Sequence, residues 1–163
     1  MCKTNNSNKN KFQCGFTLVE MLIVIAIIGI IAAFAYPSYQ KHVLRSNRSD
    51  AITALAALAV AQEKMLALNG RYSNNAVELG MTTSPNGLYE IRAVHGRWSG
   101  SNCSNANDDT SKPRQYTLLA TPIPSGRQAN DVECQCLYVD DAGNKGATGD
   151  GDPGRCWNEQ RQQ

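Results

Sequence analysis

The sequence predicts an α+β fold in which a long N-terminal helix packs on a small antiparallel β-sheet and disulfides close the C-terminal region. Three observations lead to this prediction. An apolar run of 21 residues, 16–36, continues into an amphipathic segment that reaches a helix stop near residue 69. Short stretches of alternating apolar and polar residues follow, separated by turn signals. Four cysteines lie from residue 103 onward.

The first 15 residues are interpreted as a leader. Their only charged side chains are three lysines, and positive residues before an apolar segment hold that end in the cytoplasm. An ordinary secretory signal is one alternative, but it needs a shorter apolar core with a small-residue cleavage site after it, whereas here Gly15 precedes the run. The other alternative is a plain signal-anchor, in which the apolar run simply holds the protein in the membrane. The lysines are Lys3, Lys9 and Lys11.

The apolar run is long enough to cross a membrane. Its 21 residues would span roughly 31 Å as a helix, about the thickness of a bilayer core. Glu20 is its one charged residue, and a titratable group inside a span is by default functional. The nearest candidate partner is the amine that a cut between Gly15 and Phe16 would create. Gly29 and Ala33, four residues apart, offer a small-residue face for close helix packing.

The sequence Gly15-Phe16-Thr17-Leu18-Val19-Glu20, followed by an isoleucine-rich span and Pro37, resembles the N-terminus of type IV prepilins. A second stretch, from Ala61-Gln62-Glu63 to Asn69-Gly70-Arg71-Tyr72, is similar to type IVa pilins, especially a minor-pilin subgroup. The resemblance implies cleavage after Gly15, N-methylation of Phe16 and assembly into a filament whose core is the bundled 16–36 segments. It also implies that the helix can loosen between Gly29 and Pro37.

Residues 38–68 are expected to continue the helix and become amphipathic. The first turns are basic, with Lys41, His42, Arg45 and Arg48, and we interpret them as a solvated face rather than a lipid site. Apolar positions then recur at helical spacing in a stripe that includes Gln62. Asn69-Gly70 predicts the helix end, because either residue can take the left-handed conformation. The stripe comprises Ile52, Leu55, Ala59, Gln62 and Leu66.

Four strands are predicted after a turn-rich linker. The first three are residues 88–94, 115–121 and 134–140, in which alternate residues are apolar. A short fourth strand lies near residues 145–148, after the turn signal at 141–144. The residues expected to face inward in the first two strands are Tyr89, Ile91, Ala93, Tyr116, Leu118 and Ala120.

The cysteines indicate an oxidising compartment. Cys2 and Cys14 leave with the leader, and an even number remains on the outer side of the membrane. A bond between the two neighbouring cysteines of the third strand is disfavoured by their spacing, and the remaining connectivities stay open from the residues alone. The resemblance to pilins implies the pairs Cys134–Cys156 and Cys103–Cys136. A metal site is not expected, because the paired C-x₂-C spacing is missing.

Other chemistry has weaker signals. The two histidines lie in no nucleophile or metal motif, so an enzyme is the least supported class and no cofactor is expected. The acidic, glycine-rich segment 149–154 is interpreted as turn chemistry, with a weak calcium site as the alternative. Basic residues lie near aromatic ones and could bind single-stranded DNA, but scattered solvated arginines explain them equally well, so nucleic acid is the less favoured partner. These basic residues are Arg92, Arg97, Lys112, Arg114, Arg127 and Arg155.

Taken together, the sequence predicts a structural subunit of a type IV pilus, major or minor, that serves adhesion, twitching motility or DNA uptake. Residues 1–15 are the leader, 16–52 the membrane and filament-core helix with its extension, and 53–163 the head. The expected partners are other pilins, the prepilin peptidase, the inner-membrane assembly machinery and, before assembly, inner-membrane lipid. The head is expected in the periplasm and later on the extracellular pilus. The alternatives are a type II secretion pseudopilin and a DNA-receptor minor pilin.

Overall fold

The computed structural model describes residues 16–98, 100 and 102–158. The chain divides into two compact units, Met1–Gln40 and Lys41–Gln163. One helix, α1 (Leu18–Asn69), contributes to both of them. The predicted leader, residues 1–15, lies outside the described residues.

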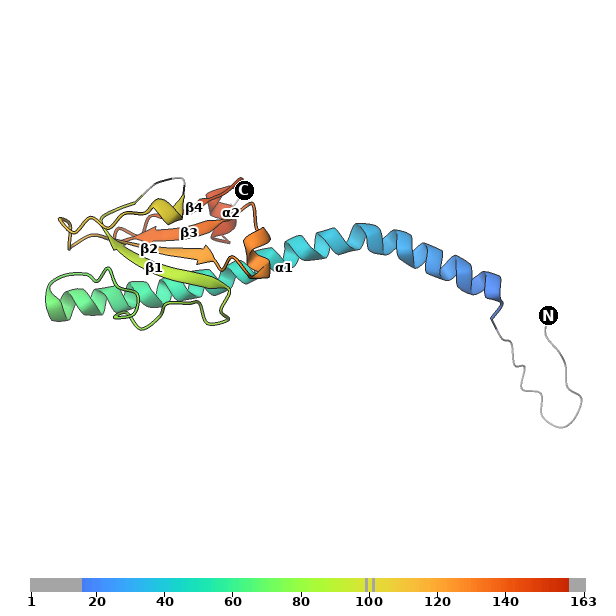
Figure 1. Cartoon of the computed structure of the whole chain (residues 1–163), viewed down its shortest axis with the longest axis horizontal. Helices are drawn as coiled ribbons and strands as arrows, with labels where there is room; N and C mark the ends of the chain where they lie inside the picture. The colour runs from blue at the N-terminus through green and yellow to red at the C-terminus, as the bar shows by residue number, and fades with distance from the viewer. Residues whose placement is uncertain (1–15, 99, 101, 159–163) are drawn as a thin grey trace, which may run out of the picture. The chain divides into compact units, whose positions relative to one another are not determined.

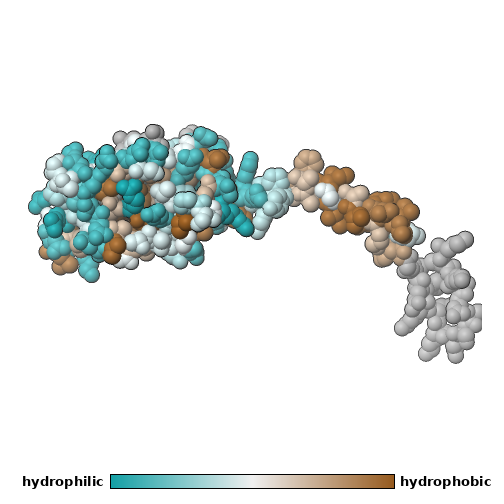
Figure 2. All heavy atoms as spheres, viewed as in Figure 1, coloured by the Kyte–Doolittle hydropathy of each residue, from teal (hydrophilic) through white to brown (hydrophobic). Residues whose placement is uncertain are grey.

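In the first unit, α1 is a bare apolar helix. Every side chain from Phe16 to Gln40 is exposed, and apolar residues dominate the surface of this segment in Figure 2. Among the described residues, α1 is the one helix long and apolar enough to cross a membrane. A helix suits the interior of a bilayer, because lipid offers no hydrogen-bond partners and a helix satisfies its backbone hydrogen bonds internally.

In the second unit, α1 becomes the amphipathic helix of a head. Buried residues recur along one face at intervals of three and four, and alanines give the segment high helix propensity. The helix ends at Asn69, and Gly70 adopts a left-handed φ of 69° while its amide donates to the Leu66 carbonyl at 2.8 Å. The helix stop predicted at Asn69-Gly70 is therefore confirmed.

A four-stranded antiparallel sheet covers this part of α1 in the order β1-β2-β3-β4 (Figure 1). Each strand pairs with the next one along the chain, so the sheet is a meander with no crossover. The predicted α+β fold is confirmed, with strand bounds that shift by at most two residues. The strands are β1 (Tyr89–His95), β2 (Tyr116–Pro122), β3 (Cys136–Asp140) and β4 (Lys145–Thr148).

The two faces of the sheet belong to different apolar clusters. The inner face packs on α1 with the alternate residues of β1 and β2 predicted to point inward. The outer face carries a second, smaller cluster, in which residues of the β1–β2 loop (residues 96–115) cover the strands. That cluster contains Val94, Cys103, Ala106, Leu119 and Cys136, with Trp98 and Tyr138 packed against it.

β2 ends at Pro122, and the amide of the next residue, Ile123, donates to the Leu88 carbonyl at 3.1 Å. One local feature differs from the sequence prediction. The segment interpreted as turns near residue 150 contains a short helix, α2 (Pro153–Cys156). Its N-cap is Asp152, whose carboxylate accepts from the Gly154 amide at 2.8 Å, and Pro153 suits the first helical position.

Candidate functional site

The residues predicted for processing and assembly lie at or near the start of the chain. Gly15 falls outside the described residues, and Phe16 is exposed just before α1. Glu20 lies in the first turn of α1, where its amide donates to the Thr17 hydroxyl at 3.2 Å. Gly29 has open space on its side-chain side, and Pro37 lies inside α1, which continues through it. Their roles in cleavage and assembly stay predictions.

Two disulfides tie the head together, and they join the pairs expected from the resemblance to pilins. Cys103 in the β1–β2 loop bonds Cys136 at the start of β3. Cys134, just before β3, bonds Cys156 in α2. The first fastens the loop to the outer face of the sheet, and the second fastens the C-terminal segment beside β4.

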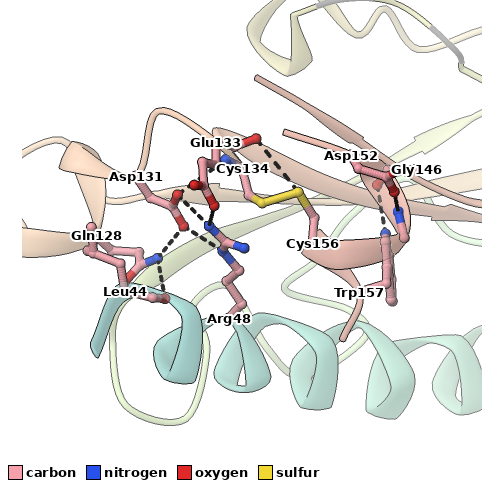
Figure 3. Close-up of a disulfide and its surroundings, with 11 residues drawn as sticks. Leu44, Arg48, Gln128, Asp131, Glu133, Cys134, Gly146, Asp152, Cys156 and Trp157 are labelled. Carbon is pink, nitrogen blue, oxygen red and sulfur yellow. Dashed lines mark hydrogen bonds and ion pairs between the residues drawn. A yellow bond between two sulfur atoms is a disulfide. The ribbon is translucent and has the colours of Figure 1, made fainter. Parts of the chain in front are cut away.

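A buried polar cluster connects α1 to the segment before the second disulfide (Figure 3). Arg48 points from the helix toward two carboxylates: its Nε lies 2.7 Å from Asp131 Oδ2, and its Nη2 lies 2.8 Å from Asp131 Oδ1 and 3.0 Å from Glu133 Oε2. Gln128 adds bonds from its Nε2 to Asp131 Oδ2 at 3.0 Å and to the Leu44 carbonyl at 3.1 Å. The amide of Cys134 donates to Asp131 Oδ1 at 3.3 Å. The cluster therefore holds the helix, the loop and the disulfide in one arrangement.

The interpretation of Arg48 as part of a solvated basic face is wrong. Its side chain is only 2% exposed, because it lies on the inner face of α1 and is neutralised there by Asp131. Lys41, His42 and Arg45 are exposed, as the prediction required. The sequence carried a signal for Arg48, since it continues the spacing of the buried residues toward the N-terminus. These residues are Arg48, Ala51, Leu55, Leu58 and Gln62.

The charges in this cluster shift the pKa values of its members. The hydrogen bond from Arg48 holds the pKa of Glu133 below its ordinary value, and the positive charges of Arg45 and Lys41 act in the same direction. Burial alone would lower the pKa of Arg48, but its bonds to the two carboxylates outweigh burial and raise it. Burial raises the pKa of the nearby Tyr89 hydroxyl. These pKa shifts favour a charged Arg48, a charged Glu133 and a neutral Tyr89 at neutral pH.

The β1–β2 loop forms a cleft with the end of β1. This cleft has a volume of about 280 Å³. Trp98 forms part of its wall and packs edge-on against Tyr138, with ring centroids 5.1 Å apart. Arg97 and Lys112 line the cleft as exposed cations, with 49% and 54% of their side chains accessible. The other lining residues are His95, Gly96, Asn105, Asn107 and Asp109.

The ends of the β1–β2 loop are held by polar contacts around His95. The His95 amide donates to Asp108 Oδ1 at 2.7 Å, and its ring Nε2 lies 3.1 Å from the Tyr72 carbonyl oxygen. The Trp98 amide donates to the Thr117 hydroxyl at 2.8 Å. His95 lies, partly buried, at the end of β1.

The basic residues grouped in the sequence lie in four places, one of which is β1, where Arg92 is partly buried. Arg97 and Lys112 meet at the cleft, and Arg114 is exposed in the same loop. Arg127 lies in the 3₁₀ turn η2 (Arg127–Asn130), near the start of the head, because Gln128 contacts Leu44. Arg155 lies in α2. Among the aromatic residues near these cations in the sequence, Tyr116 and Trp157 are buried, whereas Trp98 is half-buried and lines the cleft together with Arg97 and Lys112.

The glycine-rich acidic segment has a packing role. The amides of Asp150 and Gly151 donate to the carbonyls of Val132 and Glu133 at 3.0 and 2.9 Å. A side chain at Gly149 would come within 2.6 Å of the Glu133 carbonyl oxygen, and Gly149 has a φ of 120°. Glycine is thus required for the close approach of this segment to the chain before Cys134. Within the described residues, no three His, Cys, Asp or Glu side chains are grouped to hold a metal ion.

Comparison with known proteins shows the family. A family model described as "Type IV minor pilin ComP, DNA uptake sequence receptor" matches residues 37–138, more than half of the chain. A second model, the prokaryotic N-terminal methylation motif, matches residues 10–36. Among curated proteins, none matches.

Two solved structures are similar to parts of the chain. A type IV pilin from Shewanella oneidensis is 22% identical, with a TM-score of 0.43 over 63% of this chain and 89% of that one. The non-core minor pilin PilV from Neisseria meningitidis is 20% identical, with a TM-score of 0.45 over 66% of this chain and 89% of that one. The family match, the methylation motif and the apolar helix agree with the resemblance found in the sequence: this chain is a type IV pilin and belongs to the ComP family of minor pilins.

Proposed function

We propose that this chain is the DNA-receptor subunit of a type IV pilus, and that it binds double-stranded DNA through the β1–β2 loop of its head. The observation that carries the proposal is the family match, whose description names a DNA uptake sequence receptor and whose range, residues 37–138, includes the whole loop. This favours the alternative that the sequence alone ranked lower. A secretion pseudopilin is less supported, because the matching family is one of minor pilins.

The groups at the cleft suit a polyanion. Arg97 and Lys112 are two exposed cations that line the cleft together with Trp98, and the asparagine amides of the cleft are further hydrogen-bonding groups. Lysine, arginine and asparagine side chains are common phosphate partners in DNA complexes. Arg97 is paired with Asp141 at 2.8 Å and Lys112 with Asp109 at 3.4 Å. The Lys112–Asp109 pair is exposed and contributes little, so DNA phosphates can compete for Lys112. Arg97 forms a two-point pair with the largely buried Asp141, but half of the arginine side chain stays accessible to a phosphate.

The N-terminal segment acts first as an anchor and then as filament core in this proposal. A membrane peptidase cuts after Gly15, the new Phe16 amine is methylated, and the apolar helix holds the subunit in the inner membrane with its head in the periplasm. The assembly machinery then moves the subunit into the pilus, where its helix packs among those of other pilins. The methylation motif over residues 10–36 and the apolar surface of this part of α1 support this sequence of events.

Natural transformation tests the receptor function in the cell. The native gene is replaced by one carrying Arg97→Gln, Lys112→Gln and Arg114→Gln, and DNA uptake is measured together with the amount of this subunit in sheared pili. We expect normal incorporation and reduced uptake, because only surface cations are removed. Arg127→Gln is the matched control, an exposed arginine at the other end of the head. Unchanged uptake by the triple variant would leave the chain a pilin but not a receptor that uses this loop.

A further inference from the structure

The β1–β2 loop is long for a strand connection, yet it is folded onto the sheet. It spans residues 96–115, and loops longer than about 12–15 residues without secondary structure are uncommon and usually functional or disordered. Here the loop contains only the 3₁₀ turn η1 (Cys103–Asn105) among its described residues. Its conformation must therefore come from contacts with the strands beneath it.

Arg92 of β1 contacts the loop through two backbone carbonyls at once. Its Nη1 donates to the Cys103 carbonyl and its Nη2 to the Ala106 carbonyl, both at 3.2 Å. The first carbonyl belongs to the first residue of η1 and the second to the residue that follows η1, and the Ala106 amide donates to the Cys103 carbonyl at 3.1 Å. The planar guanidinium can donate to both acceptors at once, which a lysine ammonium with a single nitrogen does less well. One side chain therefore fixes both ends of the turn.

The disulfide fastens the same turn to β3. Cys103 is bonded to Cys136, and both are buried in the outer cluster, where Ala106 packs with them. Asp108, two residues after Ala106, accepts from the His95 amide at 2.7 Å. The fastened part of the loop, residues 103–108, connects the two cations of the cleft, since Arg97 precedes it and Lys112 follows it. A shift of this part would change the spacing between them.

We propose that Arg92 and the Cys103–Cys136 disulfide together hold the β1–β2 loop in its DNA-binding conformation, and that Arg92 is a positioning residue rather than a DNA contact. The inference rests on the proposed function. Ordering a loop on binding costs conformational entropy, and a loop already held in its bound form avoids that cost. Loss of the Arg92 contacts or of the disulfide should therefore weaken DNA binding even when the charge of the surface is unchanged.

The test uses the full mature chain in detergent micelles. Arg92→Lys keeps the positive charge but not the double contact, and Arg92→Gln removes the charge as well. Each is compared with a variant carrying Cys103→Ser and Cys136→Ser, with the combination of Arg92→Lys and both serines, and with Arg127→Lys as a matched control. Two quantities are measured: amide hydrogen exchange of residues 102–109, and affinity for a fluorescent DNA duplex. Thermal melting and the mass of the alkylated protein verify that each variant is folded and retains the Cys134–Cys156 bond.

Arg92→Lys should exchange faster across residues 102–109 and bind the duplex about tenfold more weakly, and Arg127→Lys should do neither. Binding losses for Arg92→Lys and the double serine variant should be non-additive, because both release one loop. The proposal is overturned if Arg92→Lys binds like wild type, which would make Arg92 at most a source of charge, or if the losses add.

The proposed function can fail separately from this inference. If the wild-type chain binds no duplex, the receptor function is overturned, and so is the proposal that Arg92 and the disulfide prepare the loop for DNA. The amide exchange rates still decide whether Arg92 holds the loop. If the wild-type chain binds and Arg92→Lys binds equally well, the receptor function stands and the positioning role alone is wrong.

Discussion

Arg48 and Asp131, 83 residues apart in sequence, form a buried two-point ion pair in which both side chains are 2% exposed. Nε and Nη2 of the arginine lie 2.7 and 2.8 Å from the two carboxylate oxygens. Because Asp131 also accepts from the Cys134 amide, the pair joins α1 to the segment that enters the Cys134–Cys156 disulfide. The conformation of the C-terminal region therefore depends on a residue near the start of the head.

Replacing Arg48 should destabilise the head strongly. Arg48→Met leaves the buried carboxylate of Asp131 without its cation, and breaking such a pair costs about 3–5 kcal/mol. The free energy of unfolding measured by urea denaturation checks this. Arg45→Met, which removes an exposed arginine three residues earlier, should cost less than about 1 kcal/mol. Equal decreases in the free energy of unfolding for the two variants would show that the buried ion pair stabilises the head no more than an exposed arginine does.

Acidification should remove the contribution of Glu133. Its pKa is lowered in the folded head by the hydrogen bond from Arg48, relative to an ordinary value of about 4.5. The charged carboxylate thus stabilises the fold above that value, and the contribution disappears as pH falls through the lower, folded-state pKa. Glu133 is about half exposed, so solvent screening limits the effect to roughly 1 kcal/mol or less.

The measurement for Glu133 is the pH dependence of the free energy of unfolding for wild type and Glu133→Gln. The difference between them should be constant near neutral pH and close as the pH falls below about 4.5. Glu90→Gln, at an exposed position on β1, controls for the loss of one negative charge. If the difference in the free energy of unfolding persists at low pH, the ion pair between Arg48 and Glu133 is not its cause.

The mature chain should carry no free thiol. Its four cysteines are paired as Cys103–Cys136 and Cys134–Cys156, so alkylation without reduction should add no mass once the leader is removed. Replacing Cys134 and Cys156 by serine opens a loop with a sequence separation of 22, which should cost on the order of 3 kcal/mol. Labelling of two or more cysteines in unreduced mature protein would contradict the pairing.

Glu20 should be needed for assembly but not for insertion. Glu20→Ala removes a charge from the apolar segment, so insertion becomes easier. In a filament, however, the Phe16 amine would be buried without its counter-charge, which costs several kcal/mol. We expect cleavage after Gly15, detected by mass spectrometry of the N-terminus, and poor incorporation, detected by comparing membrane and sheared-pilus fractions. Normal incorporation would disprove the pairing, and loss of cleavage would assign Glu20 to peptidase recognition.

The repeating patterns of the sequence were sufficient for the fold. Alternation placed Tyr89, Ile91 and Ala93 on the inner face of β1, where the structure has them. Asn69-Gly70 marked the end of α1 because a left-handed residue was required there. These features depend on local backbone preferences and on burial of one face, and both can be deduced from residue spacing.

The buried polar cluster could not be deduced in the same way. The partner of Arg48 lies 83 residues away, and no local pattern specifies which carboxylate will approach a given arginine. The contacts of Arg92 are also invisible in the sequence, because they go to backbone carbonyls rather than to side chains. Likewise, the cleft depends on how a long loop folds back on the sheet, so the cations near Trp98 could not be separated from those elsewhere on the head.

The most direct measurement is the affinity of the full mature chain in detergent micelles for a DNA duplex as a function of salt. Each phosphate neutralised contributes about 0.9 to the slope of log affinity against log salt. The variant with Arg97→Gln, Lys112→Gln and Arg114→Gln should bind at least about tenfold more weakly, with a slope smaller by roughly 2 to 3, while Arg127→Gln should match wild type. Identical affinity and slope for the triple variant and wild type, or no binding by wild type, would contradict a DNA receptor that uses the β1–β2 loop.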